Sequence, residues 1–203
     1  MTLTVNNLRA AIERLTAAME RDFDALNSAD GALGDGDLGV TMTRGMRAIS
    51  DLAPGLPDDL GQALLACAQG FTKTSGSSYG TLMATGLMSM AKTLRGKTGV
   101  EAAEVSALIA GARDAMQARG KADLGGKTVL DSLDAIARAT EGLGDPGAVA
   151  TAAADAAKAA QAEMRGKIAT IGRARIFGEK TIGMDDPGMM AMTAIAAAIA
   201  GRD

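Results

Sequence analysis

The chain has 203 residues, no histidine, one cysteine and a formal net charge of −3. Without histidine it can form no phosphohistidine, no Ser-His-Asp triad, no imidazole metal ligand and no histidine general base. The slightly negative charge offers no basic face for nucleic acid. A single cysteine, Cys67, excludes an intramolecular disulfide, which suits a reducing cytoplasm. Any catalysis must therefore use carboxylates, Lys or Arg side chains, backbone amides or a bound ion.

Hydrophobic residues make up 47% of the chain, but aromatic residues only 2%. A core built from Ala, Leu, Ile, Val and Met favours close-packed helices over a sheet. The N-terminus has no apolar signal region, and no uninterrupted apolar stretch is long enough to span a membrane. We therefore expect a single cytoplasmic domain over residues 1–203, with no membrane and no nucleic-acid partner.

Apolar residues recur at helical spacing from the N-terminus onward. The first stripe predicts one amphipathic helix over about residues 5–27, and the second predicts a helix around residues 42–49. Pro57-Asp58-Asp59 predicts the start of a third helix, because proline fits the first turn and acids are favourable near the N-terminal end. A stretch of small polar residues, 72–80, predicts a loop before the fourth helix.

The second half of the chain continues the helical pattern, with apolar stripes around residues 105–112 and 129–136. The alanine-rich stretch 146–164 has high helix propensity, and a last helix begins near Asp186-Pro187. The linkers are short except for residues 171–185, a stretch too long for an idle connection. About eight helices with short links and no convincing strand predict an all-α fold, an antiparallel bundle or barrel.

The stretch SADGALGDGDLGV (28–40) contains GDGDLG, which fits the dinucleotide-binding pattern G-x-G-x-x-G. That pattern requires a preceding strand within a βαβ unit, whereas a predicted helix precedes this one. Asp30, Asp35 and Asp37 would also repel a pyrophosphate unless divalent cations lay between them. Mg²⁺ is commonly held by carboxylates together with substrate phosphates, and the neighbouring glycines allow a sharp turn. A solvated acidic turn between two helices is the alternative interpretation.

Two other phosphate- or cation-binding loops are excluded. GKT occurs at 96–98 and again at 126–128, but a Walker A loop needs a glycine five residues before its last glycine. Those positions hold Ala91 and Lys121. Residues 30–41 lack the alternating oxygen donors and the final Glu of an EF-hand loop.

Three stretches taken together resemble one known family. They are D-x4-D-G-D-x-G at 30–39, KTSGSSYGT at 73–81 with GKTVLDSL at 126–133, and GRARIFGEKTIGMDDPG at 172–188. Their order and spacing are similar to those of the nucleotide-binding L subunit of dihydroxyacetone kinase, the DhaL or DAK2 family. Taken alone, the serine loop and the basic residues Arg173, Arg175 and Lys180 would be typical of solvated loops. The resemblance covers essentially the whole chain and implies an eight-helix antiparallel barrel that binds Mg-nucleotide at one end.

The resemblance also implies roles for single residues. Asp30, Asp35 and Asp37 correspond to the family's Mg²⁺ ligands, with two ions expected. Nucleotide contacts are implied at the helix start after that turn, in a Gly/Ser phosphate loop, on the adenine side and in a lid. In that order these residues are Leu38, Gly39, Val40 and Thr41; Ser75 and Gly76; Gly120 and Val129; and Lys180 with Asp186, Pro187 and Gly188.

By the same resemblance, the chain binds ADP or ATP with Mg²⁺ and serves phosphoryl transfer by positioning and charge neutralisation. The substrate, dihydroxyacetone or a related C4 ketose such as a tetrulose, is held through a histidine on a separate DhaK-like subunit. In this family the donor is either free ATP or a phosphotransferase-system protein that rephosphorylates bound ADP. A nucleotide-binding regulatory module without turnover, or a plain helical scaffold with an acidic turn, are the alternative functions.

The chain departs from the family pattern at a few positions. The family usually has His where Leu38 stands and often has His where Met184 stands, and Thr72 and Lys73 replace two glycines of its phosphate loop. The three aspartates are retained. The departures therefore bear on the substrate and the phosphoryl donor rather than on the metal.

Overall fold

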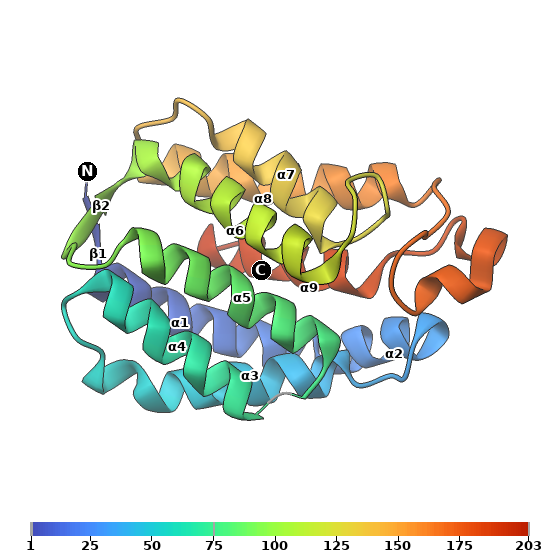
Figure 1. Ribbon diagram of the computed structural model, residues 1–203, viewed down its shortest axis with the longest axis horizontal. Coiled ribbons are helices and arrows are strands. Elements are labelled where there is room, and N and C mark those ends of the chain that lie inside the picture. Colours follow the sequence, from blue (N-terminus) through green and yellow to red (C-terminus); the bar gives the residue numbers. More distant parts are fainter. Residues whose placement is uncertain (1, 75, 203) are drawn as a thin grey trace.

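Helices fold back and forth along nearly the whole chain in the computed structural model, which describes residues 2–74 and 76–202 (Figure 1). The α-helices of this part are α1 (Val5–Arg21), α2 (Phe23–Leu33), α3 (Leu38–Leu52), α4 (Leu60–Thr74), α5 (Ser78–Thr93), α6 (Val105–Gly120), α7 (Val129–Thr140), α8 (Pro146–Met164) and α9 (Pro187–Ile199). Two short strands are β1 (Thr2–Thr4) and β2 (Gly99–Glu101), and short 3-10 helices cover Ala53–Gly55, Ala102–Glu104 and Ala174–Thr181.

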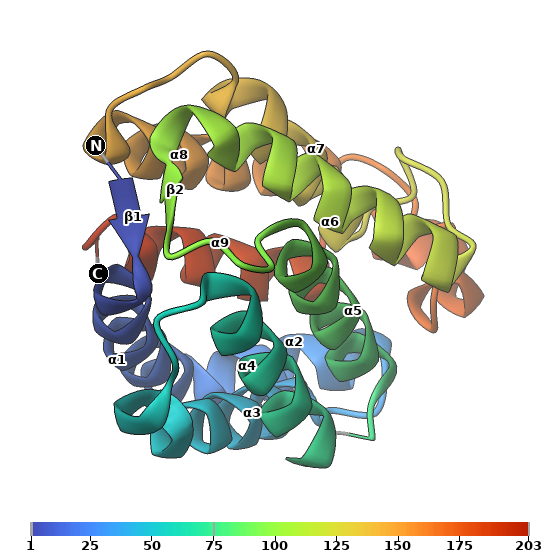
Figure 2. The same cartoon turned by 60° about the vertical axis from the view of Figure 1, so that its left-hand side comes forward.

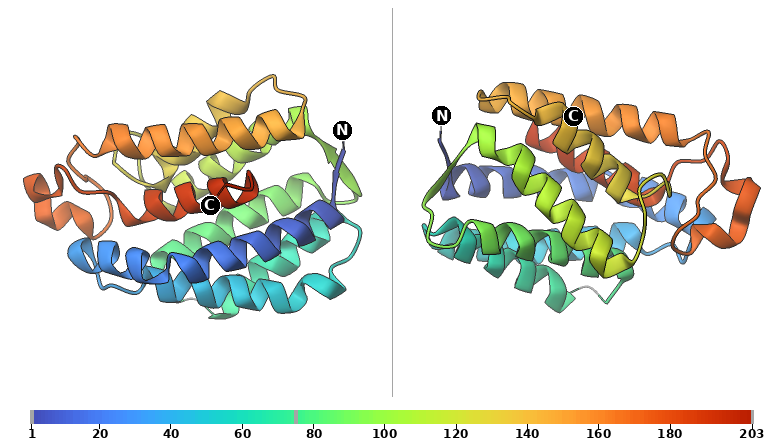
Figure 3. Two further views of the ribbon diagram at one scale, coloured as in Figure 1. Left: turned by 180° about the vertical axis from the view of Figure 1, so that it is seen from behind. Right: turned by 45° about the horizontal axis from the view of Figure 1, so that its top comes forward.

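Eight of the described helices form a closed ring in which each packs on the next. The order is α1, α3, α4, α5, α6, α7, α8 and α9, and α9 packs back on α1 (Figures 2 and 3). Consecutive members run in opposite directions, and α2 extends α1 beyond one end of the ring (Figure 1). The predicted all-α, eight-helix antiparallel architecture is thereby confirmed.

The single helix predicted over residues 5–27 is wrong in its extent, because the chain breaks at Asp22. Asp22 leaves helical geometry at φ −92° and ψ 6°, and its carboxylate pairs with Arg21. Aspartate often ends or begins a helix in this way, since its side chain competes for local hydrogen bonds. The second segment, α2, then continues to Leu33, so that Asp30 lies in the last turn of a helix.

The start predicted for the third helix is also corrected. Helix α4 begins at Leu60, so that Pro57 lies before the helix and not in its first turn. Asp59 marks the start instead, since its carboxylate accepts the amide hydrogen of Gln62 at 3.0 Å. An acidic side chain at this position satisfies one of the free amides of the first turn.

The loop predicted over residues 72–80 is shorter than expected, because α4 continues to Thr74 and α5 begins at Ser78. Ser77 caps α5 by accepting the amide hydrogen of Gly80 at 3.0 Å. Serine is among the preferred residues at this position, which explains why the helix starts inside the polar stretch.

Two strands were not predicted, and they form the only sheet among the described residues. β1 and β2 pair antiparallel, with Leu3 opposite Val100, and tie the N-terminal residues to the α5–α6 connection. Each strand has three residues, too few for an alternating pattern to stand out in the sequence. Among the described residues, no helix is both long and apolar enough to cross a membrane.

The interior of the ring is aliphatic and rich in methionine, as the composition predicts. Ile12, Met19, Met42, Phe71 and Met189 are among its fully buried large side chains. Because consecutive helices alternate in direction, the α2–α3, α4–α5, α6–α7 and α8–α9 connections all lie at one end, on the right in Figure 1. The residues of these four connections are thus gathered at one end of the barrel.

Candidate metal and nucleotide site

The predicted site residues lie on or beside the four connections at this end of the barrel. Asp30 lies in the last turn of α2, Asp35 and Asp37 lie in the α2–α3 turn, and Leu38–Thr41 begin α3. Gly76 belongs to the α4–α5 connection. Gly120 and Val129 flank the α6–α7 connection, while Lys180 and residues 186–188 lie between α8 and α9 or at the start of α9. Ser75 lies outside the described residues.

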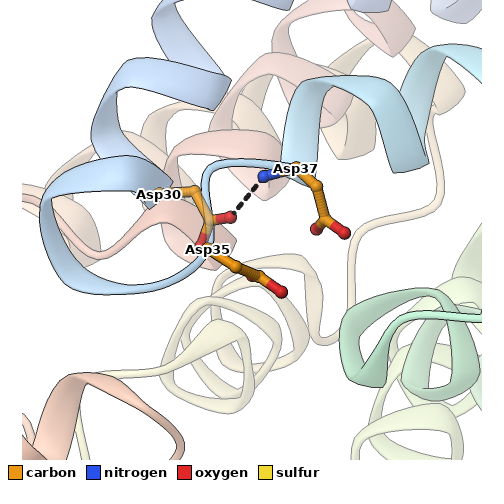
Figure 4. A group of neighbouring side chains, drawn as sticks. All are labelled: Asp30, Asp35 and Asp37. Carbon is orange, nitrogen blue, oxygen red and sulfur yellow. Dashed lines mark hydrogen bonds between the residues drawn. The ribbon is translucent and has the colours of Figure 1, made fainter.

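Asp30, Asp35 and Asp37 converge at the turn between α2 and α3 (Figure 4). One carboxylate oxygen of each can be chosen so that all three lie within 4.8 Å of one another. The backbone amide of Asp37 donates to Oδ2 of Asp30 at 2.9 Å. Gly36 makes the turn at φ +77°, a conformation that glycine adopts without a steric penalty. The turn thereby directs three acidic side chains to one place.

The charges at this turn are unfavourable to one another when no cation is present. Burial raises the pKa of Asp37, and repulsion from Asp35 and Asp30 raises it further. Asp30 lies near the C-terminal end of α2, where the helix dipole also disfavours negative charge. A divalent cation at the turn would offset each of these costs.

The oxygen set suits a small hard cation. Mg²⁺ prefers oxygen ligands at about 2.0–2.1 Å, so the ligands of one ion lie roughly 3–4 Å apart. Carboxylate oxygens within 4.8 Å of one another reach that spacing by small side-chain rotations. Exposure of Asp35 and Asp37 leaves room for water and phosphate oxygens in the same shell. The turn therefore fits Mg²⁺ that is bound partly by carboxylates and partly by water and nucleotide phosphates.

The N-terminus of α3 begins directly after the aspartates. The Thr41 amide bonds to the Asp37 carbonyl at 2.8 Å, and the Val40 amide donates to Oδ1 of Asn27 at 3.3 Å. Among the described residues, these bonds leave the amides of Leu38 and Gly39 available for an anion, as at other helix N-termini. The Leu38 side chain, 5% exposed, packs in the main hydrophobic core. At this position the chain can therefore offer a backbone amide but no side-chain contact to a ligand.

Arg173 is a member of the site that the sequence did not single out. Its guanidinium forms an ion pair with the carboxylate of Asp35, and this contact lowers the pKa of Asp35. The basic residues Arg175 and Lys180 are exposed, as expected of a solvated loop. The sequence alone does not distinguish Arg173 from these two residues, because its partner Asp35 lies 138 positions away in the chain.

A small apolar cluster also joins the long α8–α9 connection to residues 30–37, the candidate metal-binding turn, called the metal turn from here on. Leu33, at the end of α2, packs with Ala169 and Ala174, and Phe177 and Met184 lie against this group. Met184 therefore serves as an apolar contact at the position where the family often has His. The connection is held over the turn both by this cluster and by the Arg173 ion pair.

The two residues expected on the adenine side differ in their surroundings. Gly120 is exposed at the end of α6, and a Cβ at this position would lie 3.5 Å from Leu82. Val129 is buried at the start of α7. Gly120 is therefore accessible at the surface of this end of the barrel, whereas Val129 is part of its core.

Residues 186–188 fix the start of α9. Asp186 caps the helix by accepting the Met189 amide at 2.9 Å, and burial raises the pKa of Asp186 to about 7. The hydroxyl of Tyr79, on α5, donates to the carbonyl of Gly188 at 3.0 Å. A Cβ at Gly188 would lie 2.8 Å from the Tyr79 ring, so glycine is required for this close approach.

Replacing Asp186 with Asn is expected to make stability less dependent on pH. Burial raises the pKa of Asp186 from 3.8 to about 7, so between these values the folded state holds a proton that the unfolded state has lost. The stability contributed by this group is present at low pH and is lost as pH rises through about 7. Asn keeps an acceptor for the Met189 amide and does not titrate.

Melting temperatures of the two proteins, measured from pH 5 to pH 8, test this expectation. The Asp186→Asn variant should gain roughly 5 °C on the unmodified protein between the two ends of the range. Parallel curves would show that the Asp186 carboxyl titrates near its ordinary pKa.

Similarity to known proteins agrees with the site. A family model described as the DAK2 domain matches residues 32–201. Human triokinase/FMN cyclase is 34% identical over 194 residues, which cover 93% of this chain but 33% of the relative. The chain thus spans about a third of that relative's length. The ADP-binding subunit DhaL of PEP-dependent dihydroxyacetone kinase 2 from Listeria innocua is 30% identical, over 87% of this chain and 85% of the subunit.

A solved structure extends the likeness to the fold. The dihydroxyacetone kinase of C. freundii in complex with AMP-PNP and Mg²⁺ matches 99% of this chain and 34% of its own, at 25% identity and a TM-score of 0.76. The resemblance inferred from the three sequence stretches is thereby confirmed.

Proposed function

Since the chain belongs to the DAK2 domain family, we propose that it is the nucleotide-binding subunit of a dihydroxyacetone-type kinase. It binds ADP or ATP with Mg²⁺ and serves phosphoryl transfer to a small ketose held on a separate substrate-binding subunit. The observation that carries the proposal is the convergence of Asp30, Asp35 and Asp37 before the N-terminus of α3. A cation site beside a phosphate site is what Mg-nucleotide requires.

In this function the chain positions groups rather than moving protons. The carboxylates of Asp30, Asp35 and Asp37 would hold Mg²⁺, with two ions expected, and the amides of Leu38 and Gly39 would receive phosphate oxygens. Bound Mg²⁺ supplies neutralisation of the negative charge that builds up on the phosphate oxygens. Residues 165–183 lie beside the turn, where Arg173 pairs with Asp35. No histidine is present to serve as a base, so acid–base work on the ketose belongs to the other subunit.

The Listeria innocua relative supports a divided enzyme, whereas the C. freundii kinase holds the matching region within a longer chain. The Listeria innocua relative is an ADP-binding subunit of a PEP-dependent kinase, and this chain covers most of its length. The C. freundii kinase carries the matching region as about a third of one chain. We propose a DhaK-like partner for this chain on that basis. The phosphoryl donor is either ATP that exchanges at the site or a phosphotransferase-system protein that recharges bound ADP.

A reconstituted kinase assay tests the function. The chain is mixed with a DhaK-like subunit from the same organism, Mg²⁺ and either ATP or a PEP-driven relay, and dihydroxyacetone is compared with C4 ketoses. Ketose phosphate should form with one donor, and none should form when the Asp37→Asn variant replaces the chain. Nucleotide binding without phosphorylation of any ketose would reject the kinase and support a regulatory module.

Substituting Ile176 with Glu is expected to weaken binding of the substrate-holding subunit by about tenfold or more, without changing affinity for Mg-ADP. Exposed apolar side chains lie on the α6–α7 and α8–α9 connections, at the end of the barrel where the ketose must meet the phosphate. They are Leu124, Ile168, Ile176 and Ile182, and Ile176 is the most exposed at 77%. If the partner covers this face, the carboxylate of Glu at position 176 would be buried without a partner, which is costly.

Leu52→Glu provides the matched control for this substitution. Leu52 is an exposed apolar side chain at the end of α3, on the opposite end of the barrel. Surface plasmon resonance against the immobilised partner should show normal binding for this variant. Equal binding by Ile176→Glu and the unmodified chain would remove this face from the interface.

A further inference from the structure

Lys127 is a buried cation that the proposed chemistry does not use. Its side chain is 1% exposed, and its ammonium group donates to three backbone carbonyls. The acceptors are those of Thr181 at 2.7 Å, Lys167 at 3.1 Å and Arg165 at 3.3 Å. An ammonium group has three hydrogens to donate, so all three are used within the protein.

These acceptors belong to one segment, residues 165–183, whose two ends meet. The amide of Gly183 donates to the Arg165 carbonyl at 2.7 Å, and the Arg165 guanidinium donates to the Gly183 carbonyl at 3.1 Å. Inside the segment, the fully buried Thr181 hydroxyl accepts the Ala169 amide at 2.9 Å and donates to the Gly178 carbonyl at 2.7 Å. The Lys127 ammonium therefore lies where the two ends of this closed segment come together.

Lysine at this position carries two costs. The backbone is left-handed at φ +61°, a conformation that glycine adopts far more easily. Burial lowers the pKa of the Lys127 ammonium, an effect that the more distant carboxylates of Asp186 and Asp185 oppose. The three hydrogen bonds from the ammonium group offset these costs, so the side chain is an integral part of the local structure.

The segment that Lys127 holds is the one that covers the metal turn. Arg173, which pairs with Asp35, lies near its middle, and Ala169 and Ala174 pack on Leu33 at the end of α2. The α6–α7 connection that carries Lys127 is itself joined to the segment, because the Thr170 amide donates to the Gly126 carbonyl at 3.2 Å. Lys127 therefore links two of the connections at this end of the barrel.

We infer that Lys127 is a positioning residue whose ammonium group holds residues 165–183 closed over the metal turn. It keeps this segment in place beside the nucleotide site and raises affinity for Mg-nucleotide without touching the nucleotide. The part of this inference that concerns nucleotide rests on the proposed function. The part that concerns the segment does not, and the two parts are tested separately.

Amide hydrogen exchange without nucleotide tests the segment. In Lys127→Met the amides of Ala169 and Gly183, which are bonded within the segment, should exchange at least about tenfold faster. Lys127→Gly relieves the left-handed backbone but also removes the ammonium, so it should show the same loss. This second variant carries the test if Lys127→Met does not fold, which far-ultraviolet circular dichroism reveals.

Lys121→Met is the matched control, because Lys121 is also left-handed, at φ +50°, and lies exposed in the same connection. It should leave exchange in residues 165–183 unchanged. Native protection at Ala169 and Gly183 in Lys127→Gly would overturn the inference. Loss of protection throughout the ring, including α4 and α5, would also overturn it, since that result indicates a general structural role.

Calorimetric titration with ADP in the presence of Mg²⁺ tests the nucleotide part. Both Lys127 variants should bind at least about tenfold more weakly, and Lys121→Met should bind normally. Unchanged affinity in variants whose segment has loosened would overturn the link between the segment and the site. If the unmodified chain does not bind Mg-ADP, the proposed function fails, whereas hydrogen exchange still decides the role of Lys127.

Discussion

Asp37→Asn is expected to abolish the stabilisation of the protein by ADP and Mg²⁺, while the metal-free protein melts at the same or a higher temperature. The substitution removes a ligand from the candidate cation site, where even outer-shell changes weaken metal binding about 10- to 100-fold. Without metal, it removes one of three mutually repelling carboxylates. The Asp37 side chain makes no capping bond to α3, so Asn sacrifices no helix cap.

Thermal unfolding with and without Mg-ADP measures both effects. At a nucleotide concentration about 100 times the dissociation constant, binding adds about 2.7 kcal/mol to the stability of the unmodified chain, roughly 5–10 °C for a protein of this size. Asp24→Asn removes the same charge from an exposed position on α2 and should keep the full shift. A normal shift in Asp37→Asn would reject the carboxylate turn as the metal site.

Gly39→Ala is expected to lower stability by about 2–3 kcal/mol and to weaken binding of Mg-ADP as well. A Cβ at Gly39 would overlap the carbonyl oxygen of Phe23 and lie 2.8 Å from Oδ1 of Asn27. The nearest obstacle is backbone, so α2 and α3 must separate to admit the methyl group. Asp30 lies on α2 and Asp37 immediately precedes α3, so this separation also spreads the metal ligands.

Gly111→Ala is the control, because the same methyl group in the middle of α6 would meet only Ser89 Oγ, at 3.9 Å. It should stabilise the protein by about 0.5–1 kcal/mol, since alanine favours helix over glycine. Chemical denaturation gives both stabilities, and titration calorimetry gives both affinities. Equal stability of the two variants would show that α2 and α3 do not pack as closely as described.

The architecture was largely predictable, because the core is aliphatic and its spacing is helical along most of the chain. The sequence did not reveal where one helix breaks into two, or that two short segments pair as strands. The break at Asp22 separates two segments of one continuous apolar stripe. The β1–β2 pair joins residues about a hundred positions apart through three-residue strands, a contact without any periodic signal.

The site was predictable in part, through the local turn that holds the three aspartates. Its remaining members depend on long-range contacts that no single stretch records. The sequence around Arg173 predicts a solvated side chain, and only the structure shows its ion pair with Asp35. Lys127 lies in GKT, which fails as a phosphate loop, and its role becomes visible only when the carbonyls of residues 165–181 surround it.

The departure at Leu38 also gains a physical explanation. The family's usual His could face a ligand, whereas Leu38 packs into the core that α3 shares with α1 and α4. Under the proposed function, phosphate is therefore received by backbone amides at this position, and the side chains that select the ketose belong to the partner. Substrate specificity should accordingly follow the substrate-holding subunit when such subunits are exchanged.

The most direct test is a crystal structure of the chain grown with Mn²⁺ and AMP-PNP, with anomalous scattering used to locate the metal. The metal should lie in contact with the carboxylates of Asp30, Asp35 and Asp37, between them and phosphate oxygens at the start of α3. Bound nucleotide elsewhere, or manganese density away from these three carboxylates, would contradict the proposed site.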